Sequence, residues 1–192
     1  MATWTRRAKY SRRCKTGDGF IDVLKAAHAL LMAARPEKRP GELKIARNRF
    51  GQTTFVEPEL MIDTLRRGHE LILAADDAFA RALLVQFLVS DVHPFDDGNG
   101  RMSRIMMRVE LNRGGLHPIM IPNVYRDDYL TALRALTRNG NPATLIRTMH
   151  FAQEVGAAID FSSYETAKAD LQACNAFAKP SLDIKLTLPR AA

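Results

Sequence analysis

Apolar residues recur at intervals of three and four along most of this 192-residue chain, the spacing of one face of an α-helix. Proline and glycine interrupt the pattern, so it predicts separate helices of ordinary length. We expect these helices at residues 20–34, 58–73, 78–92, 100–113, 126–138, 142–160 and 163–177. No window approaches the ~20 apolar residues that cross a bilayer. The sequence therefore predicts an all-α protein that does not enter a membrane.

One short segment departs from the helical pattern. Thr53-Thr54-Phe55-Val56 is β-prone and lies between Gly51 and Pro58, which predicts a small hairpin. Residues 182–188 alternate as well, and we expect either a short strand or a disordered end there. The predicted helix 78–92 is apolar on nearly every face and should be central to the fold.

The charge is concentrated at the N-terminus. Net charge is +7, but residues 1–15 hold six basic residues and no acid, and the remainder carries 22 basic against 21 acidic residues. We expect residues 1–19 to be a disordered basic tail, 20–178 to be one domain, and 179–192 to be a C-terminal tail. Nucleic acid is an expected partner only through the basic tail. Cys14 and Cys174 lack a CxxC partner and there is no secretory signal, so we expect reduced thiols and a cytoplasmic protein.

The segment 93–104, HPFDDGNGRMSR, carries the most chemical information. It predicts a polar loop that runs directly into a helix N-terminus, where free N–H groups and the helix dipole favour an anion. Gly98 and Gly100 let a phosphate approach the main chain, and Asn99 adds a side-chain donor. Arg101 and Arg104 project on one side and can bind further phosphate oxygens. Together these features predict a polyphosphate site.

Two further residues supply the chemistry. Asp97 lies beside the phosphate site, where a carboxylate is repulsive unless a cation such as Mg²⁺ lies between them. His93 ends the preceding helix, and its neutral imidazole can accept a proton from a hydroxyl nucleophile. Phe95 is expected to point inward and anchor the loop. His28, His69, His117 and His150 share no metal-ligand spacing, and Met102, Met106 and Met107 are expected in the core.

These residues resemble the signature of the Fic (filamentation induced by cAMP) family, H-P-F-x-[DE]-G-N-G-R-x-x-R, at every fixed position from His93 to Arg104. The resemblance implies a Fic-fold helical bundle with a β-hairpin flap. Gly41-Glu42-Leu43-Lys44 resembles the lead-in to that flap. Thr54, Phe55 and Val56 would be the residues that align a target segment by strand addition.

The resemblance implies a protein adenylyltransferase that transfers AMP from ATP to a Tyr, Ser or Thr hydroxyl of a target protein and releases pyrophosphate. His93 would be the general base and Asp97 would bind Mg²⁺. Gly98, Asn99 and Gly100 would hold the α- and β-phosphates. Arg101 would contact the β-phosphate region, and Arg104 the γ-phosphate.

Other functions stay open. Doc-like members of the family act as kinases and lack the two glycines kept here, which favours AMP transfer, although the motif also allows transfer of another nucleotide or of phosphocholine. A catalytically silent Fic-fold module that binds a protein, or nucleic acid through its basic tail, is the second hypothesis.

In the residues that would regulate it, this sequence differs from many relatives. Such enzymes are often inhibited by a glutamate in an [S/T]-x-x-x-E-[G/N] segment that pairs with the second motif arginine, here Arg104. Only Glu57 has a threonine four residues earlier, and it lies in the flap before Pro58. Three interpretations remain: an antitoxin-like partner protein supplies the glutamate, as in toxin–antitoxin pairs; the domain is unrestrained; or an inhibitory helix was lost upstream.

Overall fold

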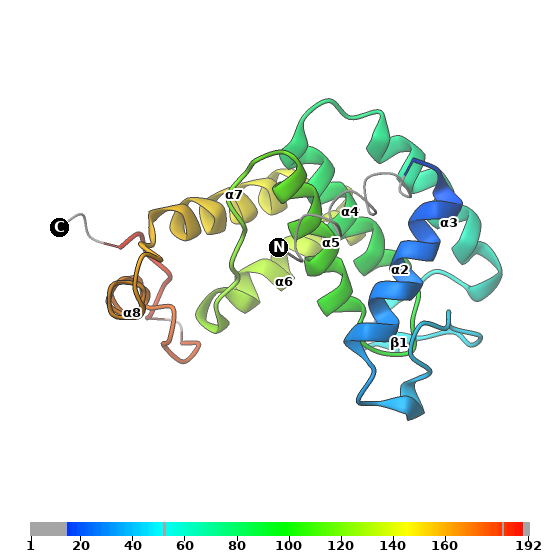
Figure 1. Ribbon diagram of the computed structural model, residues 1–192, viewed down its shortest axis with the longest axis horizontal. Coiled ribbons are helices and arrows are strands. Elements are labelled where there is room, and N and C mark those ends of the chain that lie inside the picture. The colour runs from blue at the N-terminus through cyan, green and yellow to red at the C-terminus, as the bar shows by residue number, and fades with distance from the viewer. Residues whose placement is uncertain (1–14, 52, 182, 190–192) are drawn as a thin grey trace. The chain divides into compact units, whose positions relative to one another are not determined.

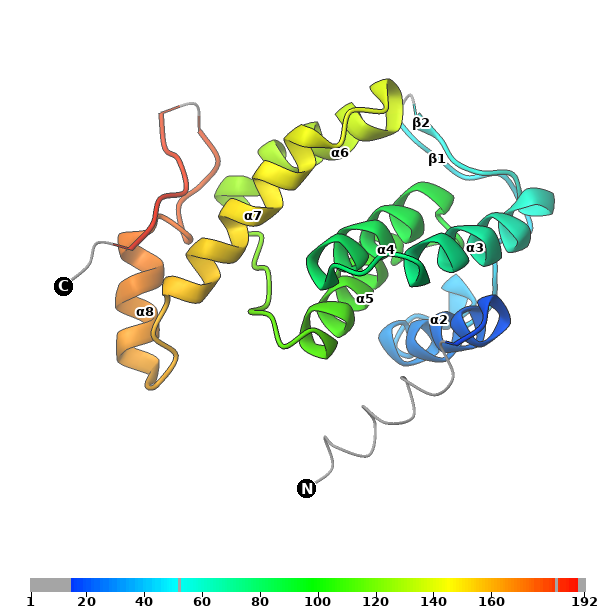
Figure 2. The ribbon, with the colours of Figure 1, turned by 90° about the horizontal axis from the view of Figure 1, so that it is seen from above.

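Helices account for most of the chain in the computed structural model, which describes residues 15–51, 53–181 and 183–189 (Figure 1, Figure 2). The prediction of an all-α protein with one small β element is confirmed. The α-helices are α2 (Gly17–Leu31), α3 (Pro58–Leu73), α4 (Ala78–Val92), α5 (Asn99–Arg113), α6 (Arg126–Asn139), α7 (Ala143–Ala158) and α8 (Tyr164–Ala173). The remaining elements are the 3-10 turns η1 (Pro36–Lys38) and η2 (Asn123–Tyr125) and the strands β1 (Arg49–Phe50) and β2 (Thr53–Thr54). Within the described ranges, we find no helix with the length and apolar character that a membrane span requires.

The helix starts follow from local sequence. Asp77 caps α4, because its carboxylate accepts the N–H of Ala80 at 2.6 Å. Pro58 is the first residue of α3, where its missing N–H costs nothing. The hydroxyl of Thr16 accepts the N–H of Gly19 at 3.1 Å, so α2 begins at Gly17, within the segment 1–19 that the sequence assigned to the tail. The rest of that predicted tail, residues 1–14, lies outside the described residues.

The chain divides into two compact units, the first ending at Gly114 and the second beginning at Gly115. The sequence pattern does not predict this division within the expected 20–178 domain. The first unit holds α2 to α5 and the hairpin, and the second holds α6 to α8. Residues 183–189 form no strand; Leu186 is buried, and the N–H of Thr187 donates to the carbonyl of Cys174 at 3.2 Å. Cys174 is a free, buried thiol, whereas Cys14 lies outside the described residues.

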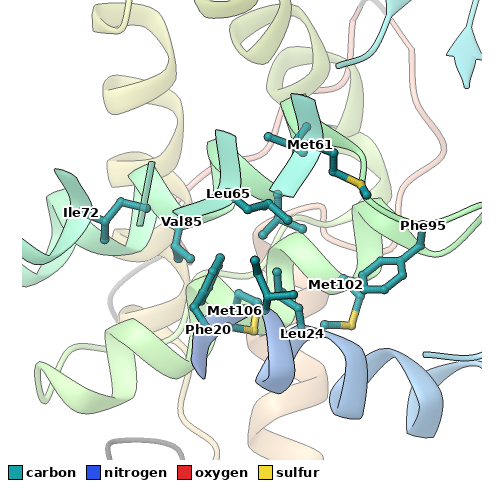
Figure 3. Packing of buried hydrophobic residues seen from close by; sticks show 12 residues of the cluster. Phe20, Leu24, Met61, Leu65, Ile72, Val85, Phe95, Met102 and Met106 are labelled. Atoms are coloured by element: carbon teal, nitrogen blue, oxygen red, sulfur yellow. The ribbon is translucent and has the colours of Figure 1, made fainter. Parts of the chain in front are cut away.

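The core of the first unit lies among its four helices. Helix α4 packs along α5 on one side and α3 on another, and α2 packs against α3 and α5 (Figure 1). Phe20, Leu24, Met61, Leu65 and Met106 converge between these helices (Figure 3). The three methionines of α5 and Phe95 are buried, as predicted. This core fixes the end of α4 and the start of α5, and therefore the loop between them.

One buried histidine makes this core sensitive to acid. His69 of α3 stacks on Phe20 with ring centroids 4.3 Å apart, and its buried Nδ1 has no hydrogen-bond partner among the described residues. Burial, reinforced by the charge of Arg113, lowers the pKa of His69 to about 4. A histidine with a lowered pKa contributes full stability above its unfolded value of 6.5 and loses it as pH falls toward 4. Protonation should therefore cost about 3 kcal/mol across that window.

We expect the melting temperature to fall between pH 6.5 and 4.5, and His69→Phe should reduce that fall while keeping a ring against Phe20. The measurement is a series of thermal melts at stepped pH. His28 and His93, whose pKa values burial also lowers, should retain part of the slope. The exposed His117→Phe is the matched control; an equal slope in wild type and His69→Phe would contradict the assignment.

Candidate active site

The loop between α4 and α5 begins with a strained residue. His93 caps α4 in the left-handed region, with φ 54° and ψ 60°, and its N–H donates to the carbonyl of Val89 at 3.2 Å. A non-glycine residue there costs energy and persists only where its surroundings hold it. The chain then turns at the buried Pro94 toward the start of α5.

Hydrogen bonding assigns the protons of the His93 ring. Nδ1 lies 3.1 Å from the carbonyl oxygen of Ser90, and because a carbonyl only accepts, Nδ1 carries the hydrogen. In the neutral ring Nε2 is then the unprotonated nitrogen. Burial lowers the pKa of His93, the Ser90 carbonyl and Asp97 oppose this, and the charge of Lys44 reinforces it. The ring is therefore neutral at pH 7 and has a nitrogen that can accept a proton.

The middle of the loop is held by Phe95 and Asn99. Phe95 is fully buried and stacks on His28 with centroids 3.7 Å apart. The Asn99 amide accepts the N–H of Phe95 at 2.9 Å and donates to its carbonyl at 2.7 Å. The expectation that the Asn99 side chain adds a phosphate donor is therefore corrected, because this buried amide closes the loop instead.

His28 fixes the next part of the loop from α2. Its Nε2 donates to the carbonyl of Asp97 at 3.0 Å, which leaves Nδ1 to accept the N–H of Gly41 at 2.9 Å. The ring is fully buried, and burial lowers its pKa, which keeps it in this neutral form. Gly98 lies against this ring with φ 79°, and an added Cβ would lie 3.1 Å from the Met32 sulfur. Only glycine takes this conformation without strain.

The N-terminus of α5 offers an anion site. The carbonyl of Gly98 accepts the first intrahelical bonds, from the N–H groups of Arg101 and Met102. The N–H groups of Asn99 and Gly100 precede these bonds and have no intrahelical acceptor. A Cβ built on Gly100 would meet only the Arg104 guanidinium, at 3.6 Å from Nη1. The predicted combination of open main-chain N–H groups and an arginine is therefore brought together here.

Asp97 and two arginines border this helix start. The Asp97 carboxylate accepts the N–H of Gly98 at 2.6 Å through Oδ1 and contacts the Arg35 guanidinium at 2.6 Å through Oδ2. Arg101 lies 3.9 Å from the same Oδ2 and donates to the Met32 sulfur at 3.3 Å. The Gly98 N–H, with the Arg35 and Arg101 charges, lowers the pKa of Asp97, so the group is ionised at neutral pH.

This carboxylate fits the ligand set that Mg²⁺ uses beside phosphates. Oδ2 already faces a cationic group, Arg35, which is a stand-in for a cation at this position. No cluster of three or more acidic, histidine or cysteine residues that could hold a metal occurs in the described part of the chain. Mg²⁺ bound by one carboxylate, with phosphate oxygens and water as its other ligands, matches this composition.

The hairpin lies beside His93. Strands β1 and β2 pair antiparallel, with Arg49 opposite Thr54, so the strands lie at 49–50 and 53–54. Of the predicted flap residues, Thr54 is exposed, and Val56 packs against the core of the first unit. The Phe55 ring stacks on the His93 imidazole, with centroids 3.7 Å apart and planes 10° apart. The hairpin therefore reaches the candidate base directly.

Several residues that hold this loop were not singled out for that role by the sequence, among them His28, Arg35, Lys44 and Asn48. Lys44 and Asn48 donate hydrogen bonds to main-chain carbonyls of the loop. The signal for His28 was available, because it stands on the apolar stripe of its helix between Leu24 and Met32. The others lie in the segment 35–48, which has no periodic pattern.

The surroundings of Arg104 bear on the expected inhibitory glutamate. Glu57 accepts a hydrogen bond from Arg47 at 2.8 Å, within the lead-in and exit of the hairpin. Within residues 15–51, 53–181 and 183–189, no carboxylate forms an ion pair with Arg104.

Comparison with known proteins agrees with this fold and loop. Residues 20–111, which include the whole segment 93–104, match the model of the Fic/DOC family. Over this segment the chain is therefore similar to the Fic/DOC family.

Two curated relatives match part of the chain. The chain is 28% identical over 117 residues to protein adenylyltransferase fic-1 of Caenorhabditis briggsae, covering 59% of this chain and 23% of that protein. It is 38% identical over 66 residues to protein adenylyltransferase Fic of Drosophila grimshawi, covering 34% and 13%. The chain thus spans less than a quarter of the length of these curated relatives.

Solved structures support the fold. Fic-1 (residues 134–508) from C. elegans has a TM-score of 0.60 at 24% identity, covering 69% of this chain and 40% of that one. A Fic family protein from Desulfovibrio desulfuricans G20 has a TM-score of 0.62 at 19% identity, covering 80% and 51%. At these identities the likeness concerns the arrangement of helices.

Proposed function

We propose that this chain is a protein adenylyltransferase that transfers AMP from ATP to a side-chain hydroxyl of a target protein. The observation that carries the proposal is the pairing, in one short loop, of a neutral imidazole with open helix-start N–H groups. Nε2 of His93 is available as a base, and the N–H groups of Asn99 and Gly100 can bind phosphate. The family match and the names of the curated relatives support the same reaction class.

The proposed step balances as an in-line displacement. His93 Nε2 takes the proton of the target hydroxyl as its oxygen attacks the α-phosphorus of ATP. A new P–O bond forms, the bond from the α-phosphorus to the bridging oxygen breaks, and pyrophosphate leaves. The products are an AMP ester on the target and an imidazolium, which returns its proton to solvent.

The other site residues act by position and charge. Arg101 and Arg104 bind the outer phosphate oxygens, and Phe55 and the hairpin align the target segment above His93. Asp97, kept ionised by its Gly98 hydrogen bond, holds Mg²⁺. When bound there, Mg²⁺ supplies charge neutralisation of the phosphate oxygens.

A labelling experiment tests the proposal against its alternatives. The chain is incubated with Mg²⁺ and a cell lysate, and with ATP labelled on either the α- or the γ-phosphorus. AMP transfer labels protein only from α-labelled ATP, whereas Doc-like kinase activity labels protein only from γ-labelled ATP. Absence of label with ATP and the other nucleoside triphosphates would sink the proposal and leave the binding-module hypothesis.

Gly100 provides a separable test of the phosphate site. Gly100→Ala should leave folding intact, because the added methyl meets only a flexible arginine end and alanine favours a helix. Because the Cα–Cβ bonds of a helix tilt toward its N-terminus, the same methyl should crowd the first N–H groups of α5. We therefore expect ATP affinity to fall at least about tenfold, which corresponds to about 1.4 kcal/mol. Calorimetric ATP binding and a thermal melt measure the two effects.

Gly98→Ala is the matched contrast, because its backbone is left-handed and its new methyl would meet the Met32 sulfur. This variant should lower the melting temperature as well as ATP affinity. Unchanged ATP affinity in a folded Gly100→Ala variant would mean that phosphate does not bind over this residue.

A further inference from the structure

The four consecutive main-chain carbonyls of residues 92–95 are all held by the same two residues. Each accepts a hydrogen bond from Lys44 or Asn48, which lie four residues apart in the lead-in to the hairpin. The bonds run from Lys44 Nζ to Val92 O at 3.0 Å, from Asn48 Nδ2 to His93 O at 3.1 Å, from Lys44 N to Pro94 O at 2.9 Å and from Asn48 Nδ2 to Phe95 O at 3.0 Å. We call this pair of residues the carbonyl clamp.

The two residues of the clamp are hydrogen-bonded to each other, and Asn48 is also hydrogen-bonded to the hairpin. The Lys44 ammonium donates to Oδ1 of Asn48 at 2.9 Å, which orients the amide so that its NH₂ faces the loop. Asn48 directly precedes β1, and its carbonyl accepts the N–H of Phe55 at 3.3 Å. Phe55 in turn stacks on His93. The hairpin and the His93 turn are therefore connected through both main chain and side chain.

The burial of Lys44 is energetically unusual. The residue is only 2% exposed, yet its ammonium donates to two neutral oxygens, Oδ1 of Asn48 and the carbonyl of Val92. Within the described ranges, no carboxylate lies in ion-pair distance of this ammonium. A buried charge without an ion pair is costly. Val92 is the last residue of α4, so the ammonium lies at the negative end of the helix dipole, which offsets part of that cost. A neutral residue would fill the same space without this penalty.

The turn that the clamp holds is the strained one. His93 is a non-glycine residue at φ 54°, and this conformation persists only where neighbouring groups fix the backbone on both sides. The clamp bonds lie at the carbonyl before His93, at its own carbonyl and at the next two. Relaxation of the turn would carry the ring away from Ser90 and change which nitrogen faces the site.

We propose that Lys44 and Asn48 are positioning residues that hold His93 in its left-handed turn, with Nε2 presented as the base. The proposal rests on the proposed adenylyl transfer for its kinetic consequence, but its structural consequence is independent of that function. Neither residue touches the reacting atoms; both act through the backbone of His93.

The Lys44 charge adds an electrostatic effect to the mechanical one. Three groups face His93: the Lys44 ammonium from the hairpin lead-in, the Asp97 carboxylate from the loop and the Ser90 carbonyl from α4. The ammonium disfavours the imidazolium and so lowers the pKa of His93, whereas the carboxylate and carbonyl raise it. Removing the ammonium should therefore raise the pKa of His93.

The test compares Lys44→Met, Lys44→Arg and Asn48→Leu, with the exposed Lys25→Met as the control. We expect the turnover of AMP transfer from α-labelled ATP to lysate protein to fall about 10- to 100-fold in Lys44→Met and Asn48→Leu, since misplacement by about 1 Å can cost that much. The KM for ATP should not change, because the N-terminus of α5 is untouched. Lys44→Arg, which keeps the charge and the donors, should recover part of the turnover.

An NMR titration of the His93 ring is the second readout. Lys44→Met should raise the pKa of His93 relative to wild type, and Lys44→Arg and Lys25→Met should not. Asn48→Leu should weaken the Nδ1–H tautomer that the Ser90 bond selects, seen in the ring nitrogen shifts, and it serves in place of Lys44→Met if that variant does not fold.

The proposal is overturned if activity falls only in step with the folded fraction and the His93 titration and tautomer stay as in wild type. Failure of the proposed function gives a different result. Wild type would then transfer no label from any nucleotide, while the His93 ring would still respond to the Lys44 and Asn48 substitutions.

Discussion

Replacement of His93 by asparagine is expected to reduce AMP transfer at least about 100-fold while leaving the fold and ATP binding intact. The expectation follows from the ring assignment, in which Nδ1–H is bonded to the Ser90 carbonyl and Nε2 remains to accept a proton. An amide cannot take that proton. Asparagine is chosen because it tolerates the left-handed backbone that His93 adopts, so the turn itself is kept.

The measurement is label transfer from α-labelled ATP to protein, with calorimetric ATP binding and a thermal melt on the same samples. His117→Asn, an exposed histidine of the second unit, is the control and should transfer label as wild type does. Wild-type rates from a folded His93→Asn protein would remove His93 from the reaction. A loss of ATP binding equal to the loss of rate would instead make it a nucleotide-binding residue.

The pH dependence of AMP transfer should also reflect the role of His93 as the base. Burial and the Lys44 charge lower the pKa of His93, so its neutral form persists below the ordinary value of 6.5. Activity should therefore hold as pH falls through 6.5 and decline only at lower pH, measured in short assays so that the separate acid sensitivity of the fold does not intrude. A decline that begins above pH 7 would contradict this assignment.

The sequence predicted the helices because their signals are local. Prolines, caps and apolar spacing act within a few residues of each other, so α3 and α4 begin and end where they were expected. The strands were placed less well, because two residues on each side of Gly51 carry too little alternation to define a pair. The division at Gly114 depends on long-range contacts that no local pattern contains.

In the candidate site, too, the sequence predicted the local features and missed the long-range ones. The sequence identified the segment 93–104 as a candidate site, because its residues are contiguous and chemically specific. The sequence did not identify the residues that hold this segment in place. Lys44 and Asn48 lie about 45 residues from the carbonyls that they bind, and their partners are main-chain atoms, which every residue has. The role of the Asn99 side chain could not be predicted either, since an amide next to glycines can bind phosphate or its own loop with equal chemical sense.

Neutralising Asp97 should raise the Mg²⁺ concentration that AMP transfer requires more than any other change of charge in the loop. In Asp97→Asn the amide oxygen still accepts the Gly98 N–H, so the loop keeps its shape, but the negative charge is gone. We expect the Mg²⁺ concentration for half-maximal transfer to rise at least about tenfold and the maximal rate to fall about 100-fold, which corresponds to about 2.7 kcal/mol of transition-state stabilisation.

The neighbouring carboxylate gives a closely matched control. Asp96 accepts two hydrogen bonds from Arg39, at 2.8 and 3.2 Å, and so resembles Asp97 in carrying an arginine partner near the surface. Such exposed ion pairs contribute little to stability, so both Asp96→Asn and Asp97→Asn should fold. Only Asp97→Asn should change the response to Mg²⁺. Equal effects of the two substitutions would show that the site needs negative charge in general and not a ligand at residue 97.

Arg35→Ala is expected to change the Mg²⁺ requirement in the opposite direction. Its guanidinium lies 2.6 Å from Oδ2 of Asp97, so in the proposed site the arginine would compete with Mg²⁺ for this carboxylate. Removing it should lower the Mg²⁺ concentration for half-maximal transfer, measured in the same titration with ATP held constant. In the Asp97→Asn background the same substitution should have no effect, because the oxygen for which the two cations compete no longer carries charge. A shift that persists in the double variant would mean that Arg35 acts on the nucleotide and not through Asp97.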